Sequence, residues 1–290
     1  MVDPRPDPDS QSKPDPNIQT YNSPEIATHY AALDYLTPCE RLLFDEYLRP
    51  GMDVLDLGVG GGRLTPHLSS IAERYVGADY APEMVAACRN KFPQLEFETA
   101  SAVDLSKFTP SSFDAVVMAF NVIDYLSPDE ARHHALREIY RVLKPEGVFV
   151  FSSHNPRAIW VRVSWNPKRV RNLAEKIVET DSIFLVPLVQ CLTALRAMVA
   201  ALQSALRSLS RAAKRLPERS FWRGEGYWMD SAHGGLKTHF AAPRIVEHEL
   251  GEFGFRLLRV LGDDYPRVSH PYVTDWYYYV FSKTGAREEN

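Results

Sequence analysis

The chain passes from an apolar strand into a run of glycines at Val54-Leu55-Asp56-Leu57-Gly58-Val59-Gly60-Gly61-Gly62-Arg63. A glycine-rich turn between a strand and a helix lets the backbone approach a ligand closely and directs free N–H groups toward it. The dinucleotide-binding spacing would place its third glycine at position 63, which is an arginine in this chain. The alternative spacing Asp-x-Gly-x-Gly-x-Gly is met in full, by Asp56, Gly58, Gly60 and Gly62. The loop therefore indicates a cofactor site, and its spacing disfavours NAD(P).

Strands and helices are expected to alternate around this loop. Short apolar runs predict strands at residues 53–57, 75–79, 95–99, 113–119 and 148–152. Helical spacing of apolar residues predicts helices at residues 23–48, 64–73, 82–91 and 128–143. Ser127 is expected to cap the last of these helices, with Pro128 in its first position. Such alternation indicates an α/β, doubly wound, Rossmann-like fold with a parallel sheet covered on both faces.

The alternation stops after Asn155 and resumes near the end of the sequence. The later elements are a helix at residues 243–253 and strands at 255–261 and 276–282. Because no helix separates these two strands, the final strand is expected to be antiparallel. We therefore expect a core domain at residues 19–155 and 240–284, split by a mainly α-helical insert at residues 156–239. Residues 1–18 offer little to bury and are expected to form a disordered tail.

Composition and cysteine usage narrow the class of protein. The chain has 290 residues, of which 45% are hydrophobic and 24% charged, which is typical of a globular protein. Cys39, Cys88 and Cys191 are widely spaced, so they predict neither a disulfide framework nor a metal site. No apolar signal segment opens the chain, and no apolar run is long enough to span a membrane. A reducing, cytoplasmic location is expected.

Four motifs follow one another in a familiar order. They are residues 54–63, residues 76–84 (Val76-Gly77-Ala78-Asp79-Tyr80-Ala81-Pro82-Glu83-Met84), residues 113–117 (Phe113-Asp114-Ala115-Val116-Val117) and residues 136–147, which end in Leu143-Lys144-Pro145-Glu146-Gly147. On these motifs the chain resembles the class I S-adenosylmethionine-dependent methyltransferases, especially their small-molecule branch. The resemblance covers residues 23–155 and 243–283. It implies a methyltransferase-type sheet, S-adenosylmethionine as cofactor, and methyl transfer to oxygen, nitrogen or carbon of a small-molecule acceptor.

The resemblance also implies which residues hold the methionine part of the cofactor. Gly58 and Gly60 would lie against it, and Asp56 would lie near its ammonium group. Tyr30 resembles the tyrosine that often covers the methionine carboxylate. Asn121, after the fourth strand, would lie beneath the cofactor and beside its methyl group.

The nucleoside part of the cofactor involves a second set of residues by the same resemblance. Asp79, at the end of the second strand, would accept hydrogen bonds from both ribose hydroxyls. Tyr80 and Met84 would flank the adenine. The family usually has an acidic residue where this chain has Ser101 followed by Ala102. We therefore expect a weaker contact with the adenine amine, or one made by the backbone.

Three residues are candidates for the chemistry of the acceptor. A general base assists methyl transfer to a hydroxyl or an amine cation, and histidine is the commonest base. His154 ends the fifth strand, and Asp124 follows the fourth, so both would lie at the rim of the site. His233 would lie in a turn between two short aromatic strands after the insert. Each of the three also has an ordinary structural explanation, as a strand-exit histidine, a loop acid or a turn residue.

The insert is strongly basic. Residues 157–223 contain 13 lysines and arginines but four acidic residues, a net charge of +9 in a chain of net charge −4. Leucine and valine recur at heptad spacing from Leu188 to Leu209, which predicts one long amphipathic helix. This helix is expected to cap the core, to form a homodimer or to contact an anionic membrane surface. Nucleic acid is disfavoured, because no nucleic-acid-binding module accompanies the charge.

Other functions remain as alternatives. DNA and protein amide methyltransferases carry Asn/Asp-Pro-Pro-aromatic after the fourth strand, whereas this chain has Asn121-Val122-Ile123-Asp124. This difference disfavours DNA and protein amides as substrates, and a methyltransferase acting on a macromolecule stays an alternative. A methyltransferase-like binding protein without catalysis is the alternative from a different class, and an NAD(P)-linked oxidoreductase is a second enzymatic one. A pocket lined by aromatic residues would suit an aromatic or lipid-like acceptor.

Overall fold

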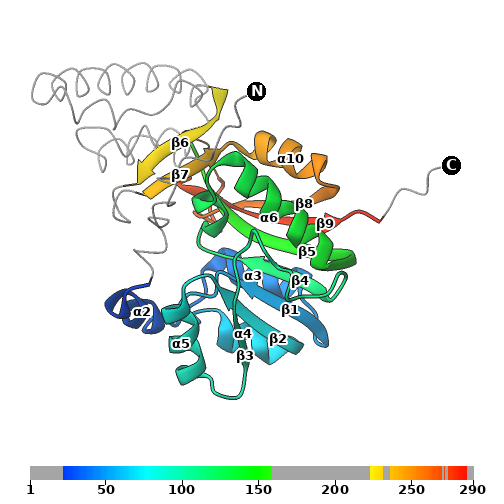
Figure 1. The fold of residues 1–290 in the computed structure, drawn as a ribbon. Coiled ribbons are helices and arrows are strands. Elements are labelled where there is room, and N and C mark those ends of the chain that lie inside the picture. The colour runs from blue at the N-terminus through cyan, green and yellow to red at the C-terminus, as the bar shows by residue number, and fades with distance from the viewer. Residues whose placement is uncertain (1–21, 159–222, 231–235, 270, 272–273, 286–290) are drawn as a thin grey trace, which may run out of the picture.

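Seven strands form one twisted sheet at the centre of the fold (Figure 1). The computed structural model describes residues 22–158, 223–230, 236–269, 271 and 274–285. The sheet order is β3-β2-β1-β4-β5-β9-β8. The strands are β1 (Met52–Leu57), β2 (Ala72–Asp79), β3 (Glu96–Thr99), β4 (Phe113–Met118), β5 (Leu143–His154), β8 (Phe255–Gly262) and β9 (Trp276–Lys283). The strands β1 to β5 pair in parallel, as expected from the alternation of strands and helices.

The last strand of the sequence lies inside the sheet. β9 pairs antiparallel with β5 on one side and with β8 on the other. The prediction of an antiparallel final strand is therefore confirmed. The edge of the sheet, however, is β8, which precedes β9 in the sequence.

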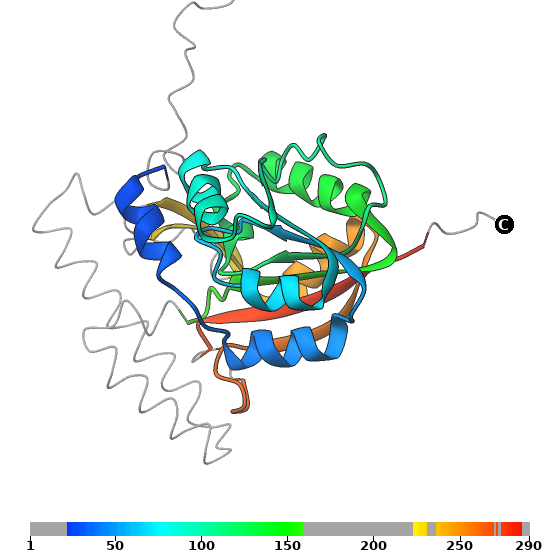
Figure 2. The ribbon, with the colours of Figure 1, turned by 90° about the horizontal axis from the view of Figure 1, so that it is seen from below.

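Helices cover both faces of the sheet (Figure 2). The buried side chains of α3 (Pro38–Tyr47), α4 (Thr65–Ile71) and α5 (Pro82–Lys91) pack on one face. Those of α6 (Asp129–Val142) and α10 (Pro243–Glu252) pack on the other. Alternate residues of each strand point to opposite faces of the sheet. Val54 packs with the cluster under α3, α4 and α5, and Leu55 packs with the cluster under α6 and α10. This arrangement is the doubly wound α/β fold that the sequence predicts.

Two helix predictions need correction. Residues 23–48 form two helices, α2 (Pro24–Ala31) and α3, rather than a continuous one. Pro38 explains the break, because proline disfavours helix in the residue before it, and Thr37 instead forms a capping box with Glu40. The prediction that Ser127 caps α6 is also wrong. Pro128 occupies the N-cap with extended backbone, which places Ser127 one residue outside the helix.

A separate two-stranded ribbon lies beside the carboxyl end of β5. It pairs β6 (Glu225–Asp230) antiparallel with β7 (Leu236–Ala241). The proposed boundary between residues 239 and 240 falls within β7, and the domain division stays a prediction. The tail at residues 1–18, the heptad helix and His233 lie outside the described residues. In the ranges that the structure describes, no helix is long and apolar enough to cross a membrane.

Candidate active site

A pocket of about 740 Å³ opens at the carboxyl ends of β1, β2, β4 and β5. In open α/β sheets ligands bind at this edge, where the strand order reverses. Here β1 and β4 are neighbours, and the chain leaves them toward opposite sides of the sheet. The pocket volume lies within the range of roughly 300–1,000 Å³ that small-molecule and cofactor sites occupy.

The glycine loop forms the floor of this pocket. Gly60 has φ +54°, in the left-handed region that favours glycine, and a Cβ there would approach only the Tyr30 ring, at 3.9 Å. Gly61 lies under α2, so that a Cβ on it would come within 2.2 Å of the Ala31 nitrogen. The loop is therefore open toward the pocket and in close contact with α2 behind it.

Two buried carboxylates flank the loop. The Asp79 carboxylate accepts hydrogen bonds from the backbone N–H groups of Gly60 and Ala81, both at 2.9 Å. Asp56 accepts one from the Tyr75 hydroxyl at 2.9 Å. Burial raises the pKa of both carboxyls, that of Asp56 to about 7. Both line the pocket.

Arg63 stands where a dinucleotide-binding loop would have its third glycine. Its guanidinium pairs with both oxygens of Glu40 on α3, at 2.8 and 2.5 Å, and donates to the Tyr35 carbonyl at 2.7 Å. It also lies over the Phe120 ring, 4.2 Å from its centroid. The side chain that breaks the dinucleotide spacing therefore anchors the glycine loop to α3.

The predicted nucleoside contacts lie together at one end of the pocket. Tyr80, Met84, Ser101 and Ala102 all line it. Met84 is buried and packs with Ala27 of α2 and Ala81. Ser101 makes a β-bridge with Asp104, and its hydroxyl accepts a hydrogen bond from the Val103 N–H at 3.4 Å. Tyr30 lines the pocket from α2.

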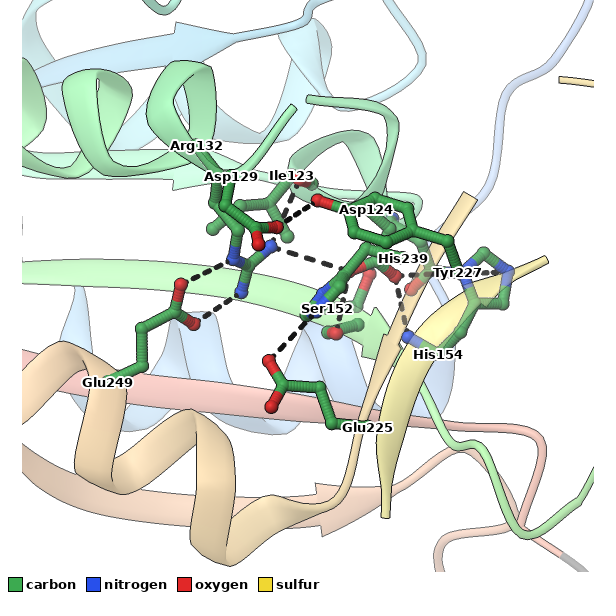
Figure 3. Close-up of polar contacts among 12 residues, drawn as sticks. Ile123, Asp124, Asp129, Arg132, Ser152, His154, Glu225, Tyr227, His239 and Glu249 are labelled. Carbon is green, nitrogen blue, oxygen red and sulfur yellow. Dashed lines mark hydrogen bonds and ion pairs between the residues drawn. The ribbon is translucent and has the colours of Figure 1, made fainter. Parts of the chain in front are cut away.

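At the other end of the pocket, His154 and Asp124 form a hydrogen-bonded pair (Figure 3). His154 Nδ1 lies 2.8 Å from Asp124 Oδ2, and the His154 backbone N–H donates to the same oxygen at 2.7 Å. Ser153 Oγ donates to Asp124 Oδ1 at 2.7 Å. Asp124 lies in the 3₁₀ helix η1 (Val122–Tyr125) and is fully buried. The structure therefore brings two of the three predicted catalytic residues together.

Asn121 contacts the ring atom of His154 that faces away from Asp124. Its Nδ2 lies 3.2 Å from His154 Nε2, and its backbone N–H donates to Ser152 Oγ at 2.9 Å. Asn121 has φ +58° and Phe120 has φ +57°, both uncommon for residues with side chains. Among the described residues, no partner contacts the buried Asn121 Oδ1. Left-handed backbone and an unpaired oxygen in a pocket are typical of a ligand site.

Behind Asp124 lies a buried ion pair that our sequence analysis missed. Arg132 of α6 lies 3.7 Å from Asp124 and makes a two-armed ion pair with Glu249 of α10, at 2.7 and 2.9 Å (Figure 3). One sequence signal could have revealed Arg132. It occupies the apolar face of α6, at the i, i+3, i+4, i+7 positions shared with Ala135, Leu136 and Ile139.

The ribbon closes the third side of this histidine site. Phe240 of β7 packs against the His154 ring, with centroids 5.0 Å apart. Next to it, the buried His239 contacts Glu225 of β6 at 3.2 Å. The Tyr227 hydroxyl donates to Asp129 at the start of α6. Sequence analysis predicted the two aromatic strands but not their contact with His154.

The residues present fit S-adenosylmethionine. Its ammonium and sulfonium are cationic, and two buried carboxylates, Asp56 and Asp79, line the pocket. A carboxylate offers about four acceptor positions, so Asp79 retains capacity for ribose hydroxyls beside its two backbone partners. Across the described part of the chain, no group of three metal-ligating side chains occurs.

The fold and the site define a nucleoside-cofactor-binding α/β protein. Residues 55–151 match the methyltransferase domain family. A probable S-adenosylmethionine-dependent methyltransferase of Mycolicibacterium smegmatis is 33% identical over 119 residues, covering 41% of this chain and 42% of the relative. The ubiquinone biosynthesis O-methyltransferase of Cereibacter sphaeroides is 29% identical over 171 residues, covering 52% of this chain and 66% of the relative. These matches span less than two thirds of either relative's length.

A solved structure supports the fold independently. The S-adenosylmethionine-dependent methyltransferase of Mesorhizobium loti has a TM-score of 0.53 and 17% identity, covering 84% of this chain and 96% of the other. In its fold and over residues 55–151 the chain is similar to the class I S-adenosylmethionine-dependent methyltransferases, whose cofactor is S-adenosylmethionine.

Proposed function

We propose that this protein transfers the methyl group of S-adenosylmethionine to a hydroxyl oxygen of a small-molecule acceptor. One observation carries the choice of oxygen. The pocket contains a histidine, His154, whose Nδ1 lies 2.8 Å from a buried aspartate, Asp124. A histidine held in this way suits the removal of a proton from a hydroxyl. An acceptor carbon or a neutral amine has less need of such a base.

The roles of the residues follow from the hydrogen bonds. In this role Asp124 accepts a hydrogen bond from His154 Nδ1–H, so the neutral ring presents a lone pair at Nε2. An acceptor hydroxyl would replace the Asn121 amide as the donor to Nε2. As the acceptor oxygen bonds to the methyl carbon, its proton would move to Nε2, and Asp124 would stabilise the resulting imidazolium. The bound cofactor supplies a methyl carbon on sulfur, which keeps the electron pair of the broken bond.

The pocket lining supports an aromatic or lipid-like acceptor. Apolar and aromatic side chains share the lining of the pocket with His154, namely Phe120, Val122, Tyr125, Leu126 and Trp276. The similarity to the ubiquinone biosynthesis O-methyltransferase of Cereibacter sphaeroides supports such an acceptor. A small molecule rather than nucleic acid, and a reducing cytoplasmic setting, belong to the same proposal.

The test combines a cofactor-binding assay with methyl transfer. Purified protein would be incubated with S-adenosylmethionine carrying a labelled methyl group and a panel of phenols, catechols, amines and fatty acids. We expect labelled O-methyl product, and a loss of roughly 10²–10⁴-fold in kcat for His154→Gln with unchanged affinity for S-adenosylhomocysteine. Methylation of amines alone, or full activity in His154→Gln, would contradict the proposal.

The same assay tests the alternative of a binding protein without catalysis. That alternative expects tight S-adenosylhomocysteine binding and no labelled product with any acceptor. A protein that stays inactive across the panel while binding the cofactor would favour it. The ordered arrangement of Asn121, His154 and Asp124 supports the enzyme.

A further inference from the structure

We propose that Arg132 and Glu249 are positioning residues that set the protonation of His154 through Asp124. The inference rests on the proposed role of His154 as a base. It assigns a function to a buried ion pair that lies outside the pocket lining, on the far side of Asp124 from His154. Neither residue would touch the acceptor or the cofactor.

The four side chains form one continuous chain of polar contacts (Figure 3). Glu249 pairs with Arg132 at 2.7 and 2.9 Å, and Arg132 Nη1 lies 3.7 Å from Asp124 Oδ1. Asp124 Oδ2 then lies 2.8 Å from His154 Nδ1. Arg132 Nη1 also donates to the Ile123 carbonyl at 3.1 Å. Arg132 therefore holds both the carboxylate of Asp124 and the backbone that carries it.

The side chains in this series of polar contacts are buried, which strengthens the electrostatic interactions between them. Asp124 is 0% exposed, Arg132 1% and Glu249 12%. Charges interact more strongly in a buried setting than in water, because less solvent screens them. Burial alone would lower the pKa of the Arg132 guanidinium, but Glu249 and Asp124 raise it, so the group stays charged. A fixed positive charge is thus placed on the far side of Asp124 from His154.

Stability alone is a weak explanation for such a pair. Well-packed apolar residues often replace a buried ion pair at no cost to stability. The position of this pair, beside the carboxylate that contacts His154, gives it a second effect. The positive charge of Arg132 offsets part of the negative charge of Asp124. Asp124 therefore stabilises a protonated His154 ring less than it would without Arg132. Glu249 offsets part of the charge of Arg132. The two residues therefore act on His154 with opposite signs.

Other ionisable groups surround His154 and are common to every variant. Asp124 and Tyr125 come from η1, and His239 comes from β7 next to Phe240. Glu225 and Tyr227 of β6 and Asp129 of α6 form the adjoining polar contacts. These groups are the same in the wild type and in every variant. A difference in the His154 titration midpoint can therefore be assigned to the change of charge at position 132 or 249.

The experiment follows protonation of the His154 ring by NMR, in the full-length protein without cofactor or acceptor. Histidine labelled at Cε1 gives one resonance per ring, and the His154 resonance is identified by its loss in His154→Gln. Glu249→Gln leaves Arg132 uncompensated, so the titration midpoint should fall by about one pH unit. Arg132→Met removes the positive charge, so the midpoint should rise by a similar amount.

Three further variants serve as controls for misfolding and for effects that do not depend on the charges of Arg132 and Glu249. Arg132→Met leaves two buried carboxylates and is the variant most prone to misfolding, so Arg132→Lys tests the same position with its charge kept. Its midpoint should stay near that of the wild type. The double variant Arg132→Met/Glu249→Gln should also return toward the wild-type midpoint. Glu247→Gln, an exposed change on α10, serves as the matched control.

Two results would overturn the inference. One is a His154 midpoint that moves in the same direction in Glu249→Gln and Arg132→Met, as a purely structural role would produce. The other is a midpoint that moves in neither folded variant. Because the readout needs no turnover, these outcomes are distinct from failure of the proposed activity, which labelled methyl transfer reports separately.

Discussion

The guanidinium of Arg63 and the carboxylate of Glu40 face each other in a two-armed ion pair, with distances of 2.8 and 2.5 Å. Both side chains are buried. The pair joins the last residue of the glycine loop to the first turn of α3, on which Glu40 also completes the capping box. The loop that lines the pocket is therefore held in place by an ion pair with α3.

Glu40→Gln should destabilise the protein strongly. The substitution leaves the Arg63 charge buried without its partner, and breaking a buried pair in this way costs about 3–5 kcal/mol. Urea unfolding should show the loss in the free energy of unfolding. The matched control is Glu96→Gln, whose partner Arg74 is exposed, and which should change stability by less than about 1 kcal/mol. Equal effects of the two substitutions would contradict the structural role of Arg63.

Gly61→Ala should weaken both folding and cofactor affinity. The added Cβ would come within 2.2 Å of the Ala31 nitrogen, so α2 must move away from the glycine loop. Since Tyr30 lines the pocket from α2, affinity for S-adenosylhomocysteine should fall as well. Gly251→Ala on α10 is the matched control, because a Cβ there meets nothing within 4 Å. It should be neutral or stabilise by up to about 1 kcal/mol. A Gly61→Ala protein with wild-type affinity would show that α2 does not form part of the site.

Asp79→Asn should abolish most of the stabilisation by the cofactor. We expect S-adenosylmethionine and S-adenosylhomocysteine to raise the Tm of the wild type, and NAD(P) to leave it unchanged. The variant should lose this Tm increase, because an amide cannot accept two hydroxyl hydrogen bonds and two backbone ones at once. Asp45→Asn, an exposed change on α3, should retain it. A full response of Asp79→Asn would exclude the ribose contact.

Affinity for S-adenosylhomocysteine should depend on pH through Asp56. Burial raises the pKa of Asp56 to about 7, which the hydrogen bond from Tyr75 only partly offsets. The free protein therefore holds this carboxyl protonated below about pH 7, whereas the ammonium of the ligand favours the carboxylate. Binding must then release a proton, so affinity should fall up to tenfold per pH unit below that value and level off above it.

Isothermal titration calorimetry in buffers of different ionisation enthalpy measures that proton release. Asp56→Asn should bind more weakly and lose the pH dependence. Tyr75→Phe should shift the fall in affinity to higher pH, because it removes the hydrogen bond that lowers the pKa of Asp56. A wild-type affinity that stays constant through neutral pH would place Asp56 away from the ligand ammonium.

Features formed by residues close together in the sequence could be predicted, because the motif that indicates each of them is a short stretch of sequence. The glycine loop and Asp79 lie within about 25 residues of each other. They belong to one strand–loop–helix–strand unit, and the spacing of its glycines and its acidic residue can be recognised in the sequence. His154 and Asp124 were placed at the same rim because parallel strands end at one edge of the sheet. Their direct contact, with Nδ1 of one against Oδ2 of the other, depends on the turn of η1.

The unpredicted features depend on packing between distant segments. Arg132 and Glu249 are 117 positions apart and meet only because α6 and α10 cover the same face of the sheet. Phe240 reaches His154 through a ribbon that follows the insert. Ser127 failed as a cap because the local preference of serine competes with the extended backbone of Pro128. None of these outcomes has a spacing rule that a single sequence reveals.

The place of β9 between β5 and β8 has a consequence for biosynthesis. When β5 leaves the ribosome, its outer edge has no partner, and the strand that will pair with it is made about 120 residues later. Until then β5 presents unpaired backbone groups to other nascent chains. The half of the sheet that carries the glycine loop can form early, whereas the half that carries His154 must wait for Trp276–Lys283. Ribosome-bound chains that end before β9 should therefore be protease-sensitive on the His154 side and depend on chaperones.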